Sequence, residues 1–189
     1  MRFDANQCTR RRDQFMKRHI IVYVFFLLCL SCTRQPSDEI KDCSLCVSEV
    51  YDKVTGTSSI AGPEILVTTD NRSGFIIRAL RTPEGVKMIS IHLVGVSPCS
   101  DENAEILLLF RDGSRLTTKS GNSSFNCDGD APIYFGGLFG NEDLLKTLQT
   151  KPIETMRIYT YKSHLQEEDF TTSQGIELMN QLNCLDKPQ

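Results

Sequence analysis

The feature that most constrains the fold is a β-hairpin pattern between residues 104 and 119. Ile106-Leu-Leu-Leu-Phe110 is apolar at every position, as in a buried central strand, and Arg115-Leu-Thr-Thr-Lys119 returns with alternating character. Asp112-Gly113 lies between them and suits a two-residue type I′ turn, which requires positive φ at both positions. If this register continues, Cys99 lies opposite residue 126, one position from Cys127.

Other segments predict further strands and two helices. Short β-branched or alternating segments, separated by Gly, Pro, Asn and Asp clusters, are typical of antiparallel strands. They lie at 64–69, 75–80, 86–94, 132–135 and 154–162. Helices are predicted at 142–150, with Asn141 as N-cap, and at 172–184, which a Thr171-x-x-Gln174 capping box opens. The predicted class is α+β: a mostly antiparallel β-sheet, as a sandwich or partly closed barrel, with two helices in the C-terminal half.

Five cysteines follow Cys32, and the odd number leaves at least one outside any intramolecular pair. They are Cys43, Cys46, Cys99, Cys127 and Cys184. The hairpin favours a Cys99–Cys127 disulfide, because both residues lie at its open end, with Cys127–Cys184 as the alternative. Cys43-x-x-Cys46 predicts a short-range disulfide or a bridge to the domain. This use of cysteine is typical of an oxidising compartment.

A short apolar stretch near the N-terminus predicts export. Lys17 and Arg18 precede Ile20–Ser31, twelve uncharged and almost entirely apolar residues. A basic start, a short apolar segment and a small residue before the cleavage point are typical of a signal peptide. Twelve helical residues rise about 18 Å, well short of the roughly 30 Å hydrocarbon layer, which disfavours a transmembrane anchor. Because Met16 begins a compact signal peptide, we interpret residues 1–15 as the product of an upstream start codon.

The end of this stretch resembles a lipobox. Leu30-Ser31-Cys32 fits the last three positions of the motif that, in bacterial lipoproteins, directs lipid transfer to a cysteine and cleavage before it. Cys29 departs from the family pattern, which usually has Leu at that position. The resemblance implies that Cys32 carries a thioether-linked diacylglycerol and an acylated amine, and several acyl chains hold a protein durably on a membrane. The alternative is ordinary signal-peptidase cleavage, which gives a secreted or periplasmic soluble protein.

The predicted organisation has three parts: a signal peptide at 1–31, a polar tether at 32–48 and one β-rich globular domain at 49–187. The first 31 residues contain 6 of the 21 basic and 2 of the 24 acidic residues. The remaining 158 residues therefore have 15 basic and 22 acidic side chains, a net charge of −7. This charge excludes nucleic acid as a partner and disfavours electrostatic membrane binding, because both partners are polyanions.

Candidate catalytic residues are few. Cys43 and Cys46 have the spacing of a thiol-redox pair, although no strand precedes them. No second Cys or His pair at metal spacing follows, so no metal site is predicted. His92 and His164 could serve a hydrolase, but neither of the nearby serines, Ser90 and Ser163, lies in a G-x-S-x-G elbow.

Two other patterns are interpreted as structural. Phe135-Gly-Gly-Leu-Phe-Gly140 precedes a helix but lacks the Gly-Lys-Ser/Thr end of a phosphate loop, which indicates a turn with apolar anchors. Glu167-Glu168-Asp169 and Asp128-x-Asp130 lack the spacing of a calcium loop, which indicates solvated acids on the surface or at a helix entry.

The sequence favours a non-catalytic lipoprotein of the cell envelope, a binding or interaction module without a cofactor. Its expected partners are the membrane, through the lipid anchor, and an envelope protein or small ligand. A thiol-redox or redox-sensing lipoprotein that uses Cys43 and Cys46 is one alternative. An envelope hydrolase is the other.

Overall fold

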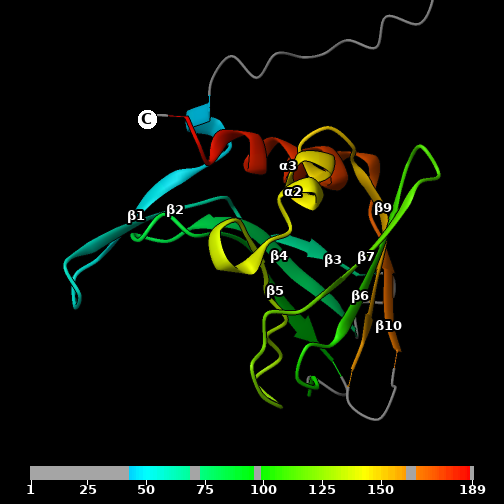
Figure 1. The fold of residues 1–189 in the computed structure, drawn as a ribbon. Helices are drawn as coiled ribbons and strands as arrows, with labels where there is room; N and C mark the ends of the chain where they lie inside the picture. The colour runs from blue at the N-terminus through cyan, green and yellow to red at the C-terminus, as the bar shows by residue number, and fades with distance from the viewer. Residues whose placement is uncertain (1–42, 69–72, 96–98, 161–164, 188–189) are drawn as a thin grey trace, which may run out of the picture. The chain divides into compact units, whose positions relative to one another are not determined.

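The computed structural model describes residues 43–68, 73–95, 99–160 and 165–187, which form two antiparallel sheets and two α-helices (Figure 1). The predicted α+β class, with both helices in the C-terminal half, is confirmed. The strands form two separate sheets and not a closed barrel. Within this part of the chain, no helix is long and apolar enough to span a membrane.

The first sheet has the strand order β1-β2-β4-β5-β8, and β3 also pairs with β4. Its strands are β1 (Ser48–Asp52), β2 (Thr57–Ala61), β3 (Ile65–Val67), β4 (Gly74–Arg81), β5 (Lys87–Val94) and β8 (Ile133–Phe135). The β1–β2 hairpin, which the sequence does not predict, contacts β4 through two residue pairs and extends beyond it (Figure 1).

An interruption separates β2 from β3 along one edge of β4. Ala61 pairs with Leu80 and Ile65 pairs with Ile77, so both strands use the same edge. Between them Gly62 donates its N–H to the carbonyl of Ala79 (2.9 Å). The N–H of Ala79 donates to an acceptor outside the sheet, the side-chain Oε1 of Gln181 (2.9 Å).

The second sheet has the strand order β10-β9-β6-β7. Its strands are β6 (Glu105–Phe110), β7 (Arg115–Lys119), β9 (Ile153–Tyr159) and β10 (Leu165–Asp169). The predicted β6–β7 hairpin is present, with Ile106 opposite Thr118. β10 occupies the segment that the sequence analysis interprets as solvated acids.

The predicted two-residue hairpin turn is wrong by one position. Phe110 donates its N–H to the carbonyl of Ser114 (3.0 Å), so three residues form the loop. Gly113 has a φ of 81°, whereas Asp112 does not adopt positive φ. The carboxylate of Asp112 instead accepts the N–H of Ser114 (2.9 Å), an interaction that favours a local Asx-type turn.

The core lies between the two sheets. Alternate residues of β4, β5, β6 and β9 point inward, as the period of a strand requires. The fully buried side chains of these strands are Phe75, Ile77, Ala79, Ile89, Ile91, Leu93, Ile106, Leu108, Phe110, Ile153, Met156 and Ile158. Gln166 links the sheets, because its Nε2 donates to the carbonyls of Gly74 (2.5 Å) and Val94 (3.2 Å).

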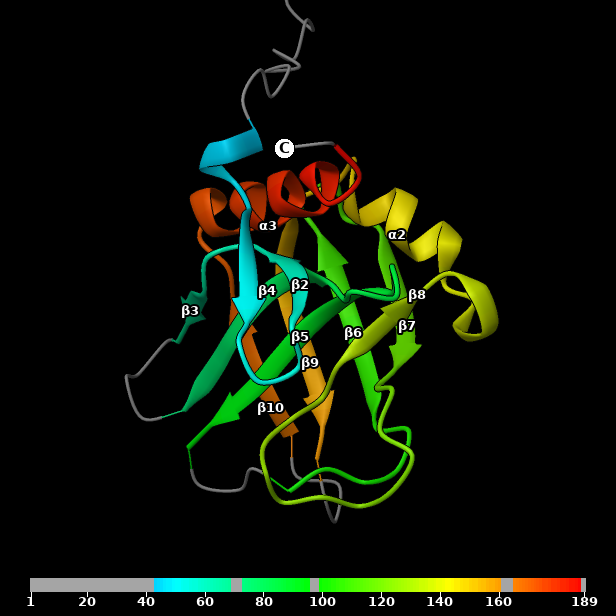
Figure 2. The same ribbon diagram turned by 90° about the vertical axis from the view of Figure 1, so that its left-hand side faces the viewer.

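Helix α3 (Thr172–Cys184) lies across one end of both sheets and contacts β3, β4 and β9 (Figure 2). The predicted capping box between Thr171 and Gln174 is confirmed. Leu178 and Leu182 are buried, whereas Ile176 is exposed. Gly175 is also buried and lies close to β9, since a Cβ there would lie 2.5 Å from the carbonyl oxygen of Ile153.

Helix α2 (Glu142–Leu148) follows a short 3-10 turn, η2 (Gly137–Phe139). Leu144 and Leu148 are buried. The predicted capping role of Asn141 is wrong: its backbone is left-handed (φ 61°), and its side chain donates instead to the carbonyl of Tyr134 (3.1 Å).

The folded unit begins before the predicted domain boundary at residue 49. A short 3-10 helix, η1 (Cys43–Leu45), precedes β1, and Val47 lies in the core with an exposed fraction of 3%. Cys43 forms a disulfide with Cys184 at the end of α3. Residues 43–48 therefore belong to the folded unit and not to a polar tether.

Candidate functional site

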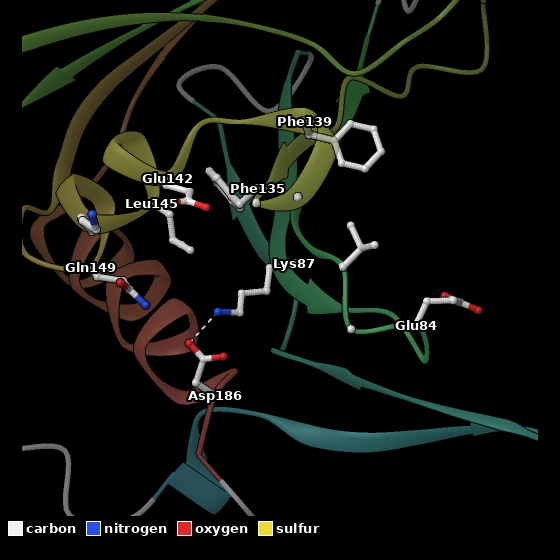
Figure 3. A pocket seen from close by; sticks show the side chains of 13 residues that line it. Glu84, Lys87, Phe135, Phe139, Glu142, Leu145, Gln149 and Asp186 are labelled. Atoms are coloured by element: carbon white, nitrogen blue, oxygen red, sulfur yellow. Dashed lines mark hydrogen bonds and ion pairs between the residues drawn. The ribbon is translucent and has the colours of Figure 1, made fainter.

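A groove of about 620 Å³ lies between α2 and the turn that joins β4 to β5 (Figure 3). Its lining side chains come from this turn, from β8 and η2, from α2 and from the chain after α3. The lining residues are Glu84, Gly85, Val86, Lys87, Phe135, Gly136, Gly137, Phe139, Glu142, Leu145, Lys146, Gln149 and Asp186. Such a volume is within the range of small-molecule and peptide side-chain pockets.

One wall of the groove is the turn at residues 82–86. Thr82 donates its N–H to the carbonyl of Val86, and Gly85 donates to the carbonyl of Thr82, both at 2.9 Å. Gly85 has a φ of 86°, a conformation that favours glycine. Hydrogen bonding to the side chain of Thr82 lowers the pKa of Glu84, so the rim of this wall carries a negative charge at neutral pH.

The opposite wall is the glycine-rich segment before α2. Gly136, Gly137 and Gly140 have φ values of 78°, 58° and 69°, and Gly136 donates its N–H to the carbonyl of Gly140 (2.8 Å). These conformations explain the repeated glycines without any bound phosphate. Phe139 stacks on Tyr134 with ring centroids 4.9 Å apart, which is the apolar anchor that the sequence predicts for this turn.

The groove combines apolar and charged groups. Phe135 is buried and Leu145 is partly buried against the core. Lys87 projects across the groove to Asp186, and its Nζ lies 2.7 Å from Oδ2 of that carboxylate (Figure 3). The lysine side chain is 24% exposed and the aspartate 51%, so solvent or a ligand can reach this ion pair.

The disulfides only partly match the predicted pairing. Cys99 bonds to Cys127 with Cα atoms 3.8 Å apart, the pairing that the hairpin favours. Cys184 bonds to Cys43 with Cα atoms 5.4 Å apart, in place of the alternative Cys127–Cys184 bond. Of the two predictions for Cys43-x-x-Cys46, the bridge to the domain is present as Cys43–Cys184, whereas the short-range bond is absent because Cys46 is in neither disulfide. The position of α3 places Cys184 beside Cys43. No local sequence pattern predicts this contact, because the two cysteines are 141 residues apart.

Cys46 lies beside a second, smaller groove of about 440 Å³ between η1 and α3. Leu45, Ile176 and Glu177 also line it. Leu45 is 83% exposed and Ile176 is 39% exposed, and Cys46 itself is partly buried. The thiol-redox hypothesis for Cys43 and Cys46 therefore has to include a third cysteine, Cys184 at the end of α3.

His92 has one of the partners of a catalytic histidine, a carboxylate at hydrogen-bonding distance. His92 Nδ1 lies 3.0 Å from Oδ1 of Asp130, and both side chains are about half exposed. Ser90 lies two residues away on the same face of β5, with its backbone roughly 6.6 Å along the strand from that of His92. His164 lies outside the described residues. The described His92–Asp130 pair is thus a hydrogen-bonded pair at the surface and not an assembled triad.

The two acidic segments have different environments, because Asp128 and Asp130 are exposed whereas one residue of Glu167-Glu168-Asp169 is buried. Glu168 is 4% exposed, which corrects its interpretation as a solvated acid. Glu167 forms an ion pair with Arg157, and Asp169 accepts a hydrogen bond from Thr155 (2.7 Å). No group of three potential metal ligands is present in the described ranges.

Comparisons with protein-family models, curated protein sequences and solved structures found no match to this chain. No sequence pattern predicts the groove beside α2, although the glycine-rich turn that forms one wall is visible in the sequence. Lys87 and Asp186 are 99 residues apart, and no local pattern indicates that they meet.

Proposed function

We propose that this protein is a lipid-anchored binding module of the cell envelope, which takes its ligand in the groove beside α2. The anchor is supported by Leu30-Ser31-Cys32, the lipobox-like end of the signal peptide. A fully extended chain from Cys32 to Cys43 reaches about 40 Å at most. The folded unit therefore remains close to the membrane surface, where its partners are envelope components.

The observation that carries the ligand site is the mixed lining of the groove. Val86, Phe135 and Leu145 come from three different elements and supply apolar surface. Two lysines and three acids surround them: Lys87, Lys146, Glu84, Glu142 and Asp186. Neighbouring groups of both signs suit a peptide segment with an apolar side chain between polar ones, and the net charge of −1 disfavours a compact anion. The ligand we propose is an exposed segment of another envelope protein.

A site-specific photo-crosslinking experiment in intact cells tests this proposal. A photoreactive side chain replaces Phe139, which is 53% exposed on the groove rim, or Leu165 on β10, which is 50% exposed and serves as the matched control. The proposal predicts a discrete cross-linked protein from position 139 but not from position 165. Adding Val86→Glu, which places a charge in the groove, removes the product.

The same experiment has clear contrary results. Equal products from both positions mean that contact is not specific to the groove. An anchored protein that gives no product at position 139 means that the groove is not the site of protein binding.

A further inference from the structure

The cysteines at the end of α3 form a cluster of three rather than one bridge and one remote thiol. Cys43 and Cys184 are bonded across 141 residues of sequence, with Cα atoms 5.4 Å apart. Cys46 follows Cys43 by one turn, and its backbone N–H donates to the carbonyl of Cys43 (3.0 Å). A turn of this i to i+3 kind places the two Cα atoms about 6 Å apart with their side chains on the same side.

That spacing allows Cys43 to bond either partner. Disulfides join cysteines with Cα separations of roughly 4.4 to 6.8 Å, and both distances fall within this range. Cys43 lies between Cys46 on its own turn and Cys184 on α3. Thus the local backbone need not be rebuilt for the bond to pass from one partner to the other.

We propose that Cys43, Cys46 and Cys184 form a thiol–disulfide exchange site. The Cys46 thiolate attacks Sγ of Cys43, the Cys43–Cys184 bond breaks, and Cys184 leaves as a thiolate that takes up the proton lost by Cys46. One disulfide and one thiol are present before and after, so no external oxidant or reductant is consumed.

The exchange would move the disulfide from a buried partner to a partly exposed one. Cys184 is fully buried, whereas Cys46 is partly exposed beside the groove between η1 and α3. In the exchanged form the disulfide joins Cys43 in η1 to Cys46 just after it, and the segment before β1 is no longer bonded to α3. An external protein dithiol can then reduce a bond near the surface instead of one that ends at a buried sulfur. This inference does not depend on the ligand groove or on the lipid anchor.

The test follows reduction of the intact protein by about 0.1 mM dithiothreitol, with acid quenching, thiol alkylation and mass-spectrometric mapping. A neighbouring thiol has an effective concentration in the millimolar range, so loss of the Cys43–Cys184 bond is expected to be roughly tenfold slower in Cys46→Ser. The Cys99–Cys127 bond serves as the internal control and keeps its rate. Equal rates for the 43–184 bond in both proteins overturn the proposal.

Two further measurements separate exchange from a change in folding. The wild-type map is expected to pass through a species with a Cys43–Cys46 bond and an alkylated Cys184. Direct conversion to three reduced cysteines, without that species, contradicts the proposal. In Cys184→Ser, oxidation by glutathione disulfide is expected to join Cys43 to Cys46, even if the variant is only partly folded; separate glutathione adducts on both residues contradict it.

Discussion

Replacing the buried side chain of Gln181 by leucine is expected to destabilise the fold. Gln181 is 0% exposed, and its Oε1 accepts the N–H of Ala79 (2.9 Å), the group that the interruption between β2 and β3 leaves for an outside partner. Its Nε2 donates to the carbonyl of Pro63 (2.9 Å). Gly62 leaves room for this amide, because a Cβ there would lie 2.1 Å from Oε1. Gln181→Leu removes both hydrogen bonds but keeps similar volume.

The size of the effect depends mainly on Ala79. Ala79 is fully buried, so leaving its N–H without a hydrogen-bond partner costs about 1–3 kcal/mol of unfolding free energy. The carbonyl of Pro63 belongs to an exposed residue and recovers much of its lost hydrogen bond from water. The added apolar surface of leucine offsets less than about 1 kcal/mol. The expected loss in unfolding free energy is about 2 kcal/mol.

Urea denaturation followed by circular dichroism measures this loss. Asn180→Leu is the matched control, because the same change one residue away on a partly exposed position is expected to alter stability by less than about 0.5 kcal/mol. A Gln181→Leu protein as stable as the control would refute the bridging role assigned to this side chain.

Three further predictions concern local interactions. Hydrogen bonding to Lys151, and secondarily to Ser114, lowers the pKa of Asp112, so Lys151→Met is expected to raise that pKa toward its ordinary value, as a carboxyl-carbon NMR titration measures. Because the folded-state pKa of Asp112 is depressed, its stabilisation is fully present above the unfolded-state pKa of about 3.9 and is lost as the pH falls through the folded-state pKa. The difference in unfolding free energy between wild type and variant therefore shrinks in acid, which urea denaturation at several pH values measures. Thr171→Ala removes the cap of α3 and is expected to cost about 1 kcal/mol of unfolding free energy, whereas an unchanged urea midpoint contradicts that role. Replacing Cys99 and Cys127 together by serine is expected to cost about 2–4 kcal/mol, measured against the wild type under non-reducing conditions; a loss below 1 kcal/mol contradicts a stabilising bridge.

Sequence patterns predict the elements whose burial is regular. β4, β5, β6 and β9 alternate or are fully apolar, and they form the core. The hairpin turn was predictable in place but not in type, because the carboxylate of Asp112 accepts a backbone N–H and stabilises a different turn. That one-residue difference is small in sequence but sets the pairing of every residue in β7.

The missed elements depend on partners that sequence does not reveal. β10 reads as an acidic surface segment, yet Glu167 lies opposite Arg157 and Asp169 lies opposite Thr155 in the pairing with β9. These cross-strand partners make the acids compatible with a strand. The β1–β2 hairpin has few apolar residues, since most of it extends beyond β4.

The candidate site was still less predictable than the fold. Its charged pair joins Lys87 on β5 to Asp186 after α3, and its apolar wall joins Phe135 to Leu145. Each residue alone is unremarkable in the sequence. Tertiary packing of α2 and α3 at the end of the sheets is what assembles them.

The most direct test of a lipid-anchored envelope protein is the intact mass of the expressed protein, together with its partition between detergent and water, beside a Cys32→Ala variant. The account predicts a detergent-phase chain that begins at Cys32 with the added mass of a diacylglycerol and an acyl group, all lost in the variant. A water-soluble chain of unmodified mass, the same in both proteins, would contradict it.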